Sequence, residues 1–218
     1  MGHRVFPRSR TAGVLRSAPN PWTGKLRAES APPVSLSTSY TGGPMTDLEL
    51  IQRIREAALL YGDFTLRSGR HSKYYLDKYL FETQPDILEA LGQRFARHVT
   101  PDVRRVAGAE LGAIPLVTVT ALATGKPSVL IRNKKKDYGT AKQIEGKLEK
   151  GDKVLIVEDI VTTGGQTLEA ARSIQELGGE VVKIVAVIDR QEGGRQNIEG
   201  AGFRFASLIT KTDLGIGE

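Results

Sequence analysis

The spacing of hydrophobic residues divides the chain into two parts. Residues 1–44 show no sustained period, whereas apolar residues recur at helical spacing from Leu48 onward. Thr46 and Glu49 stand three positions apart just before this pattern, which is the spacing of a capping box. We therefore expect a helix from Thr46 to about Leu60.

Short strand-like runs follow at 64–66 and 74–76, and the basic segment between them predicts a hairpin. Strands and helices then alternate, with strands expected at 103–107, 128–131, 153–157, 180–188 and 203–208 and helices at 85–98, 114–124 and 165–177. This alternation is typical of parallel strands joined by right-handed crossovers. We expect an α/β fold: a central, mainly parallel sheet flanked by helices, with a small N-terminal hood. Ligands of such sheets bind at the carboxyl ends of the strands.

The composition narrows the classes of function. A chain of 218 residues, 39% of them hydrophobic, is expected to form one domain over 45–218. Cysteine is absent, which excludes disulfides, thiolate nucleophiles and cysteine-based metal sites. No apolar run approaches eighteen residues and the N-terminus lacks a secretory signal, so we expect a cytoplasmic protein without a membrane span.

Residues 1–44 form a basic leader that is rich in Pro, Ser, Gly and Thr, and we expect it to be disordered. It holds six basic residues and one acidic residue, whereas the rest of the chain holds 25 basic and 24 acidic residues. The net charge of +6 therefore belongs mainly to the leader, and no nucleic-acid partner is expected. Because Met45 directly precedes the first helix, three interpretations stay open: a translation start assigned too far upstream, a transit-like peptide, or a functional basic tail.

The strongest chemical signal follows the apolar run 154–157. Glu158 and Asp159 stand at the end of this predicted strand, and burying two adjacent acids without partners would be costly, so we expect them to face a polar ligand such as sugar hydroxyls. A turn of small residues follows, from which backbone N–H groups and the next helix can bind an anion. The turn comprises Ile160, Val161, Thr162, Thr163, Gly164, Gly165, Gln166 and Thr167. It has the order neither of a P-loop nor of a dinucleotide fingerprint.

The complete string V-L-I-V-E-D-I-V-T-T-G-G-Q-T resembles the phosphoribosyl diphosphate signature of type I phosphoribosyltransferases. The resemblance implies that family's fold, with Glu158 and Asp159 on the ribose hydroxyls and the residues from Thr162 to Thr167 around the 5-phosphate. It also places Ile160 and Val161 among the residues that bind phosphoribosyl diphosphate. It also implies Mg²⁺ carried mainly by the substrate, with no protein ligand for the metal named directly.

A second segment, 64–75, resembles the hood of orotate phosphoribosyltransferases, F-T-L-x-S-G-R-x-S-x-Y. Arg67 stands where that family usually has a Lys that reaches both orotate and diphosphate. The tetrapeptide 189–192 resembles the family's D-R-Q-E, which implies that Arg190 binds the orotate carboxylate. The resemblance also implies that orotate contacts Thr162, Tyr74 and Tyr75.

A third segment, R-N-K-K-K-D-Y-G-T at 132–140, is similar to the loop that closes over the neighbouring subunit's active site in the same family. The similarity implies a homodimer with shared sites. It also implies contacts to phosphoribosyl diphosphate from Arg132, Asn133, Lys136 and Tyr138, although Asn133 and Tyr138 replace the usual Lys and His. Together with Arg67 and Asp159, Arg132 and Lys136 are the predicted catalytic residues.

One position departs from the pattern. Residues 108–115 align with the family's diphosphate loop, but Gly112 stands where many members have Lys, so no catalytic Lys is predicted there. His71 and His98 are interpreted as a hairpin-tip residue and a helix-end residue favoured by the helix dipole.

Taken together, the resemblance spans residues 47–214 and implies an orotate phosphoribosyltransferase. Such an enzyme transfers ribose 5-phosphate from phosphoribosyl diphosphate to orotate in pyrimidine (UMP) biosynthesis. Two alternatives stay open. A purine phosphoribosyltransferase would need a different hood, and a non-catalytic sensor of phosphoribosyl diphosphate is favoured only by Gly112.

Overall fold

The computed structural model describes residues 45–65, 69, 71–132 and 143–217. The predictions about the leader, 1–44, lie outside these residues. The described elements are α1 (Asp47–Ala58), β1 (Leu59–Thr65), β2 (His71–Leu76), α2 (Lys78–Glu82), α3 (Pro85–Ala96), β3 (Arg105–Ala109), α4 (Ala113–Thr124), β4 (Ser128–Ile131), β5 (Ile144–Gly146), β6 (Lys153–Val161), α5 (Gly165–Glu176), β7 (Glu180–Asp189), α6 (Gly194–Gly200) and β8 (Phe205–Thr210). Among them, no helix is long and apolar enough to cross a membrane.

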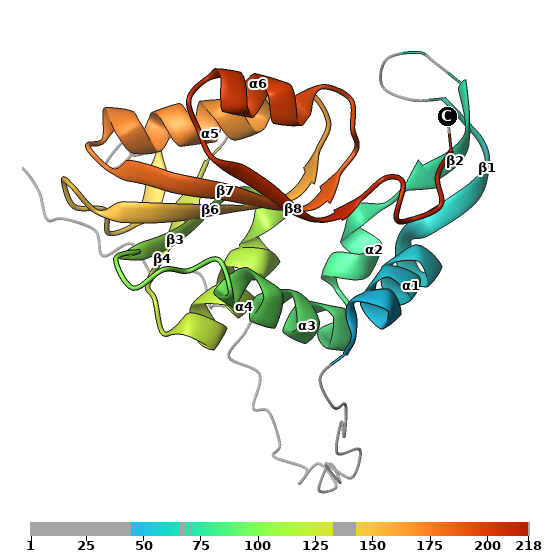
Figure 1. The fold of residues 1–218 in the computed structure, drawn as a ribbon, viewed down its shortest axis with the longest axis horizontal. Helices are drawn as coiled ribbons and strands as arrows, with labels where there is room; N and C mark the ends of the chain where they lie inside the picture. Colours follow the sequence, from blue (N-terminus) through green and yellow to red (C-terminus); the bar gives the residue numbers. More distant parts are fainter. Residues whose placement is uncertain (1–44, 66–68, 70, 133–142, 218) are drawn as a thin grey trace, which may run out of the picture. The chain divides into compact units, whose positions relative to one another are not determined.

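The described strands of the main sheet run in the order β5-β4-β3-β6-β7-β8 (Figure 1). Neighbouring strands are parallel except for β5, which pairs antiparallel with β4. The strands β1 and β2 form a separate antiparallel hairpin at the position expected for the hood. The predicted fold class is confirmed.

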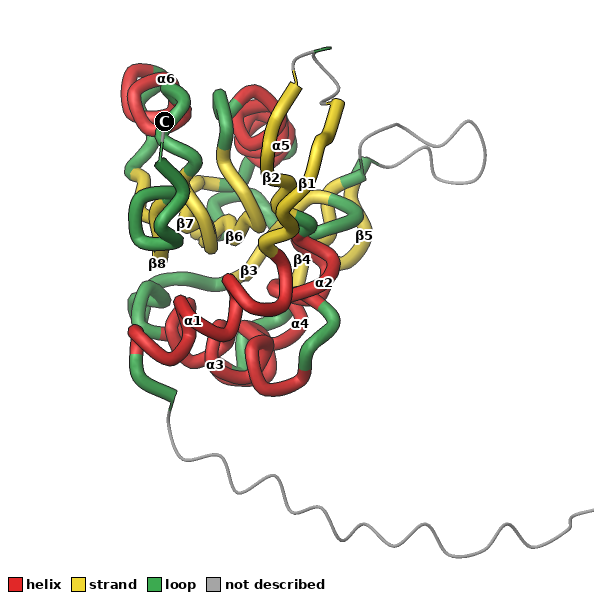
Figure 2. The backbone as a smooth tube through the Cα atoms, turned by 90° about the vertical axis from the view of Figure 1, so that its right-hand side faces the viewer, coloured by secondary structure: helices red, strands yellow, loops and turns green. Residues whose placement is uncertain are grey.

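The sheet is buried on both faces because its central strand alternates apolar side chains between two cores. Leu155 and Val157 of β6 pack with residues of α1, α3 and α4, whereas Val154 and Ile156 pack with residues of α5 and α6. Figure 2 shows these two groups of helices on opposite sides of the sheet. An unbroken apolar run, as in 154–157, is what a strand covered on both sides requires.

Helix α1 begins as predicted but ends earlier than predicted. Its capping box is present: the Glu49 N–H donates to Thr46 Oγ1 at 3.3 Å, and the Thr46 N–H donates to Glu49 Oε2 at 2.7 Å. The expected continuation to Leu60 is wrong, since Leu59 and Leu60 pair with Leu76 and Tyr75 in the β1–β2 ladder. Tertiary strand pairing overrides helix propensity there.

Several boundaries and short elements also differ from the predictions. Strand β6 continues through the two acids to Val161, because β7 pairs with it as far as Asp189. The polar segment after 131 contains the edge strand β5, and helices α2 and α6 are too short to show a helical period in the sequence.

The expected role of His98 needs correction. Its Nδ1 atom lies 3.0 Å from Lys183 Nζ, and burial, with the charge of Lys183, lowers its pKa. A helix dipole favours a charged imidazolium, whereas these surroundings disfavour the charge.

Candidate active site

A cleft of about 680 Å³ lies at the carboxyl ends of β3, β6 and β7, the edge where parallel sheets bind ligands. Its lining brings together most of the site residues predicted from the sequence with several that were not. The described lining comprises Tyr75, Leu76, Lys78, Ala109, Glu110, Gly112, Glu158, Asp159, Ile160, Val161, Thr162, Thr163, Gly164, Gly165, Gln166, Thr167, Glu169 and Arg190.

The turn between β6 and α5 forms one end of the cleft. Gly164 precedes the helix with φ of 80°, a left-handed conformation that a side chain would strain. The turn is held from outside by Asn197, whose Nδ2 donates to the Thr163 carbonyl at 2.9 Å. The first turn of α5 therefore opens onto the cleft, where its N–H groups and positive dipole end suit a phosphate.

The acid pair lies beside this turn and is more buried than expected for solvated acids. Glu158 and Asp159 are 8% and 3% exposed. Glu158 accepts from the Asp159 N–H at 3.1 Å and from Thr167 Oγ1 at 3.4 Å. Burial, with the charge of Asp159, raises the pKa of Glu158. Because both acids line the cleft, a ligand with hydroxyl donors would relieve their desolvation.

Lys78 is a cleft residue that the sequence patterns do not reveal. Its Nζ lies 2.5 Å from Asp159 Oδ2, although the two residues are 81 positions apart. Burial by itself would lower the pKa of Lys78, but the charge and hydrogen bond of Asp159 outweigh it and the pKa is raised. The available signal was a Lys two positions after the second hood strand, next to the helix-capping Asp77.

Glu82 completes this charged cluster from the other end of α2. It is 2% exposed, and neither carboxyl oxygen has a hydrogen-bond partner among the described residues. Burial, with the charge of Asp159, raises its pKa to about 9. The cluster thus holds three carboxyl groups and one ammonium group, and raised pKa values on two of the acids limit its negative charge.

Arg190 lies on the hood side of the cleft. Its Nη2 lies 3.4 Å from the Tyr74 hydroxyl and 3.0 Å from Glu192 Oε1. The preceding residue, Asp189, faces Arg195 at 3.7 Å.

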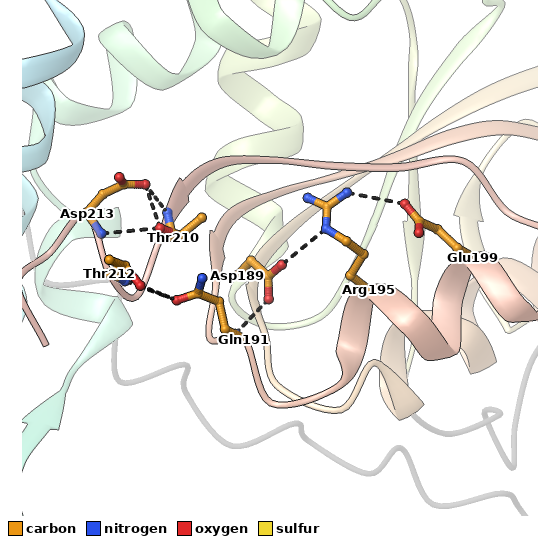
Figure 3. Close-up of polar contacts among 7 residues, drawn as sticks. All are labelled: Asp189, Gln191, Arg195, Glu199, Thr210, Thr212 and Asp213. Carbon is orange, nitrogen blue, oxygen red and sulfur yellow. Dashed lines mark hydrogen bonds and ion pairs between the residues drawn. The ribbon is translucent and has the colours of Figure 1, made fainter. Parts of the chain in front are cut away.

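The turn that carries Arg190 is held on both sides (Figure 3). Asp189 Oδ1 accepts from the Gln191 N–H at 2.8 Å. The Gln191 side chain accepts from the N–H and hydroxyl of Thr212, at 3.2 and 2.7 Å. Gln191 itself has φ of 56°, a strained conformation for a residue other than glycine. These contacts fix the direction in which the Arg190 backbone leaves the sheet.

Comparison with known proteins agrees with this geometry. The phosphoribosyl transferase domain family matches residues 86–205. An orotate phosphoribosyltransferase from Methanocella arvoryzae is 45% identical over 77% of this chain and 97% of its own length. The chain belongs to the orotate phosphoribosyltransferases. It is therefore a type I phosphoribosyltransferase, as the sequence motifs predicted.

Solved structures of orotate phosphoribosyltransferases share the fold. The Mycobacterium tuberculosis enzyme in complex with Fe(III) dicitrate has a TM-score of 0.71 and 34% identity, covering 78% of this chain and 98% of that one. The same enzyme in complex with 5-phospho-α-D-ribosyl 1-diphosphate has a TM-score of 0.67 and 33% identity over the same shares.

Some predicted site residues of this orotate phosphoribosyltransferase do not line the cleft. Arg132 follows β4, where its Nη1 lies 3.7 Å from Glu145 and 3.9 Å from Glu110, and it is not part of the described lining. The predictions for Arg67, Asn133, Lys136 and Tyr138 lie outside the described residues. Among the residues that the structure does describe, no cluster of three or more acidic or histidine side chains is arranged for a metal ion.

Proposed function

We propose that the cleft transfers ribose 5-phosphate from phosphoribosyl diphosphate to orotate, producing orotidine 5′-monophosphate and diphosphate. As an orotate phosphoribosyltransferase, the chain is a pentosyltransferase of pyrimidine biosynthesis. The observation that carries the proposal is the joining of three groups around one cavity: the phosphate-binding turn, the acid pair and Arg190. We also propose that the protein acts in the cytoplasm.

The ribose 5-phosphate half of the substrate fits the β6–α5 end of the cleft. The phosphate receives backbone N–H groups from Thr162 to Thr167 and the dipole of α5. The ribose hydroxyls then donate to Glu158 and Asp159, which are already held by the Thr167 hydroxyl and by Lys78. This arrangement fixes the ribose at both ends.

Orotate fits on the hood side, next to Arg190. Its carboxylate pairs with the guanidinium group, for which a planar fork is well suited. Tyr75 lines the same region and Tyr74 contacts Arg190 through its hydroxyl, while Thr162 approaches from the phosphate-binding turn.

In the proposed reaction, the bond between ribose C1 and the diphosphate oxygen breaks, and its electron pair leaves with diphosphate. The ribose acquires oxocarbenium character, orotate N1 forms the new bond to C1, and the N1 proton passes to the departing diphosphate, which is the base released in the same reaction. The protein aligns these atoms and stabilises the developing charges, so no covalent nucleophile is needed. The hydroxyl- and carboxylate-rich, sulfur-free lining suits Mg²⁺, which would be held mainly by the substrate and would supply charge neutralisation for the departing diphosphate.

The remaining predicted residues are proposed to act across a homodimer. In this proposal, Arg132, Asn133, Lys136 and Tyr138 reach the neighbouring subunit's cleft, and Arg67 contacts diphosphate and orotate from the hood. The position of Arg132 outside its own chain's cleft lining supports this arrangement.

The first test follows orotate absorbance with the full chain, phosphoribosyl diphosphate and Mg²⁺. We expect orotate to be consumed, and Arg190→Ala to lower kcat/KM for orotate by about 100-fold, because a charge-assisted bidentate contact is lost. Arg172→Ala, on the exposed face of α5, is the matched control and should keep wild-type rates. Turnover of adenine or hypoxanthine in place of orotate would favour a purine enzyme, and phosphoribosyl diphosphate binding without turnover would favour a sensor.

A further inference from the structure

The charge of the cleft does not match the charge of its proposed substrate. Four acids line the described part of the cavity (Glu110, Glu158, Asp159 and Glu169), but only two cations do, Lys78 and Arg190. Phosphoribosyl diphosphate carries phosphate groups at both ends. Arg190 lies at the hood beside Tyr74 and Glu192, which leaves Lys78 as the cation of the described lining that lies beside the acid pair.

The surroundings of Lys78 include the position where the chain departs from its family. Gly112 precedes α4 with φ of −61° and ψ of −38°, a conformation open to any residue. A Cβ atom on Gly112 would lie 1.7 Å from Asp159 Oδ2 and 2.9 Å from Lys78 Nζ. A side chain at 112 therefore requires the Asp159 carboxylate to move, and with it the observed Lys78–Asp159 ion pair.

We propose that Lys78 is a substrate-contacting residue, which supplies to the departing diphosphate the ammonium group that position 112 lacks. The inference rests on the proposed function and adds a residue to it. The cation reaches the same space from α2 of the hood instead of from the loop before α4, and Gly112 is small because the Lys78–Asp159 pair fills the space beside it.

The location of Lys78 suits this role. The turn before α5 takes the 5-phosphate and the acid pair takes the ribose hydroxyls, so the group on C1 extends beyond the acid pair. Lys78 and Gly112 are lining residues that lie beside Asp159 of this pair. The Lys78 side chain is 33% exposed, whereas its partner Asp159 is 4% exposed. The ammonium group can thus face the cavity while Asp159 holds it from behind.

When substrate binds, Lys78 and Asp159 each exchange one interaction partner for another. Without substrate, the ammonium group of Lys78 compensates the charge of Asp159, which would otherwise be buried alone. With substrate bound, ribose hydroxyls donate to Asp159 and the diphosphate oxygens offer Lys78 new acceptors. Asp159, the buried member of the pair, thus has a partner both with and without substrate.

The test measures binding by calorimetry, with Mg²⁺ present, for three ligands: inorganic diphosphate, phosphoribosyl diphosphate and ribose 5-phosphate. We expect Lys78→Met to weaken the binding of inorganic diphosphate and of phosphoribosyl diphosphate by about tenfold or more, because one charge-assisted hydrogen bond is lost. Binding of ribose 5-phosphate should change by less than about twofold, and Lys78→Arg should retain most of the diphosphate affinity. Lys153→Met removes a comparable Lys–Asp pair at the opposite end of β6 and should leave all three affinities unchanged.

A second experiment places a lysine at position 112 and tests whether diphosphate binding can be restored as well as lost. Gly112→Lys should by itself weaken diphosphate binding because it displaces the Lys78–Asp159 pair. In the Lys78→Met background it should restore diphosphate binding, since the cation returns to the same space from the other loop.

The inference is overturned if Lys78→Met leaves diphosphate affinity unchanged, or if it weakens ribose 5-phosphate equally, which would mean that Lys78 acts only by positioning Asp159. If Lys78→Met does not fold, the same ligand affinities are compared for Lys78→Gln and for the double variant that combines Gly112→Lys with Lys78→Met. These binding measurements need no orotate, so a failure of orotate turnover in the wild-type chain remains a separate result.

Discussion

Glu82 shows how one buried side chain can make the stability of this protein depend on pH. It is 2% exposed, lacks a hydrogen-bond partner among the described residues, and faces Asp159, Glu158 and Lys78. Burial, with the charge of Asp159, raises its pKa from the ordinary 4.5 to about 9. Between these values the folded chain keeps a proton that the unfolded chain releases.

The folded state therefore loses stability as pH rises from about 5 to 9, by up to about 1 kcal/mol per pH unit from this group. We expect Glu82→Gln, which stays neutral, to lack this pH-dependent loss, so that its stability relative to the wild type rises by up to the same amount per pH unit. Urea unfolding at pH 5, 7 and 9 measures the difference. Glu176→Gln, on an exposed position of α5, is the control, and a difference independent of pH for Glu82→Gln would contradict the assignment.

The turn after β7 shows how hydrogen bonds outside helices and strands can position a functional side chain, that of Arg190. Sequence motifs predicted Arg190, but they did not predict that Gln191 ties the turn to Thr212 through two hydrogen bonds (Figure 3). Gln191 is thus a positioning residue that directs Arg190 toward the cleft.

We expect Gln191→Ala to raise KM for orotate by about three- to tenfold, while KM for phosphoribosyl diphosphate changes little, because only the Arg190 side of the cleft is loosened. Steady-state kinetics with each substrate varied in turn provides the measurement. Gln175→Ala on the exposed part of α5 serves as the control. An equal rise in both KM values would show that the turn affects the whole cleft.

For the whole molecule, the central question is whether one chain makes a complete site. The described cleft contains the acid pair, the phosphate-binding turn and Arg190, whereas Arg132 at the start of the basic loop lies outside its lining. A homodimer in which each loop serves the other subunit's cleft accounts for both facts.

Mixed dimers test this proposal. At an orotate concentration well below KM, Arg190→Ala should retain about 1% of wild-type activity and Lys136→Ala should also lose most of its activity. When the two variants are unfolded together and refolded in equal amounts, we expect about one quarter of wild-type activity, because half of the dimers are mixed and each contains one intact site. Orotate absorbance gives the activity and sedimentation gives the oligomeric state. No recovery in mixed dimers would place the loop in its own subunit's cleft.

The pattern of hydrophobic residues was enough to predict the fold class, the alternation of strands and helices, and the buried strand segment that leads into Glu158 and Asp159. These features are local, since the periods of helices and strands are written over a few consecutive residues. The same holds for the phosphate-binding turn, whose small residues and following helix start lie within ten positions.

The hairpin strand that begins at Leu59, the pairing of Lys78 with Asp159 and the burial of Glu82 could not be predicted in this way. Each depends on residues far apart in the chain, 81 positions in the case of Lys78 and Asp159. The Lys78 side chain of α2 reaches Asp159 near the end of β6, and burial of the carboxylate strengthens their pairing. Gly112 had no explanation in the sequence, and the ion pair beside it supplies a physical one.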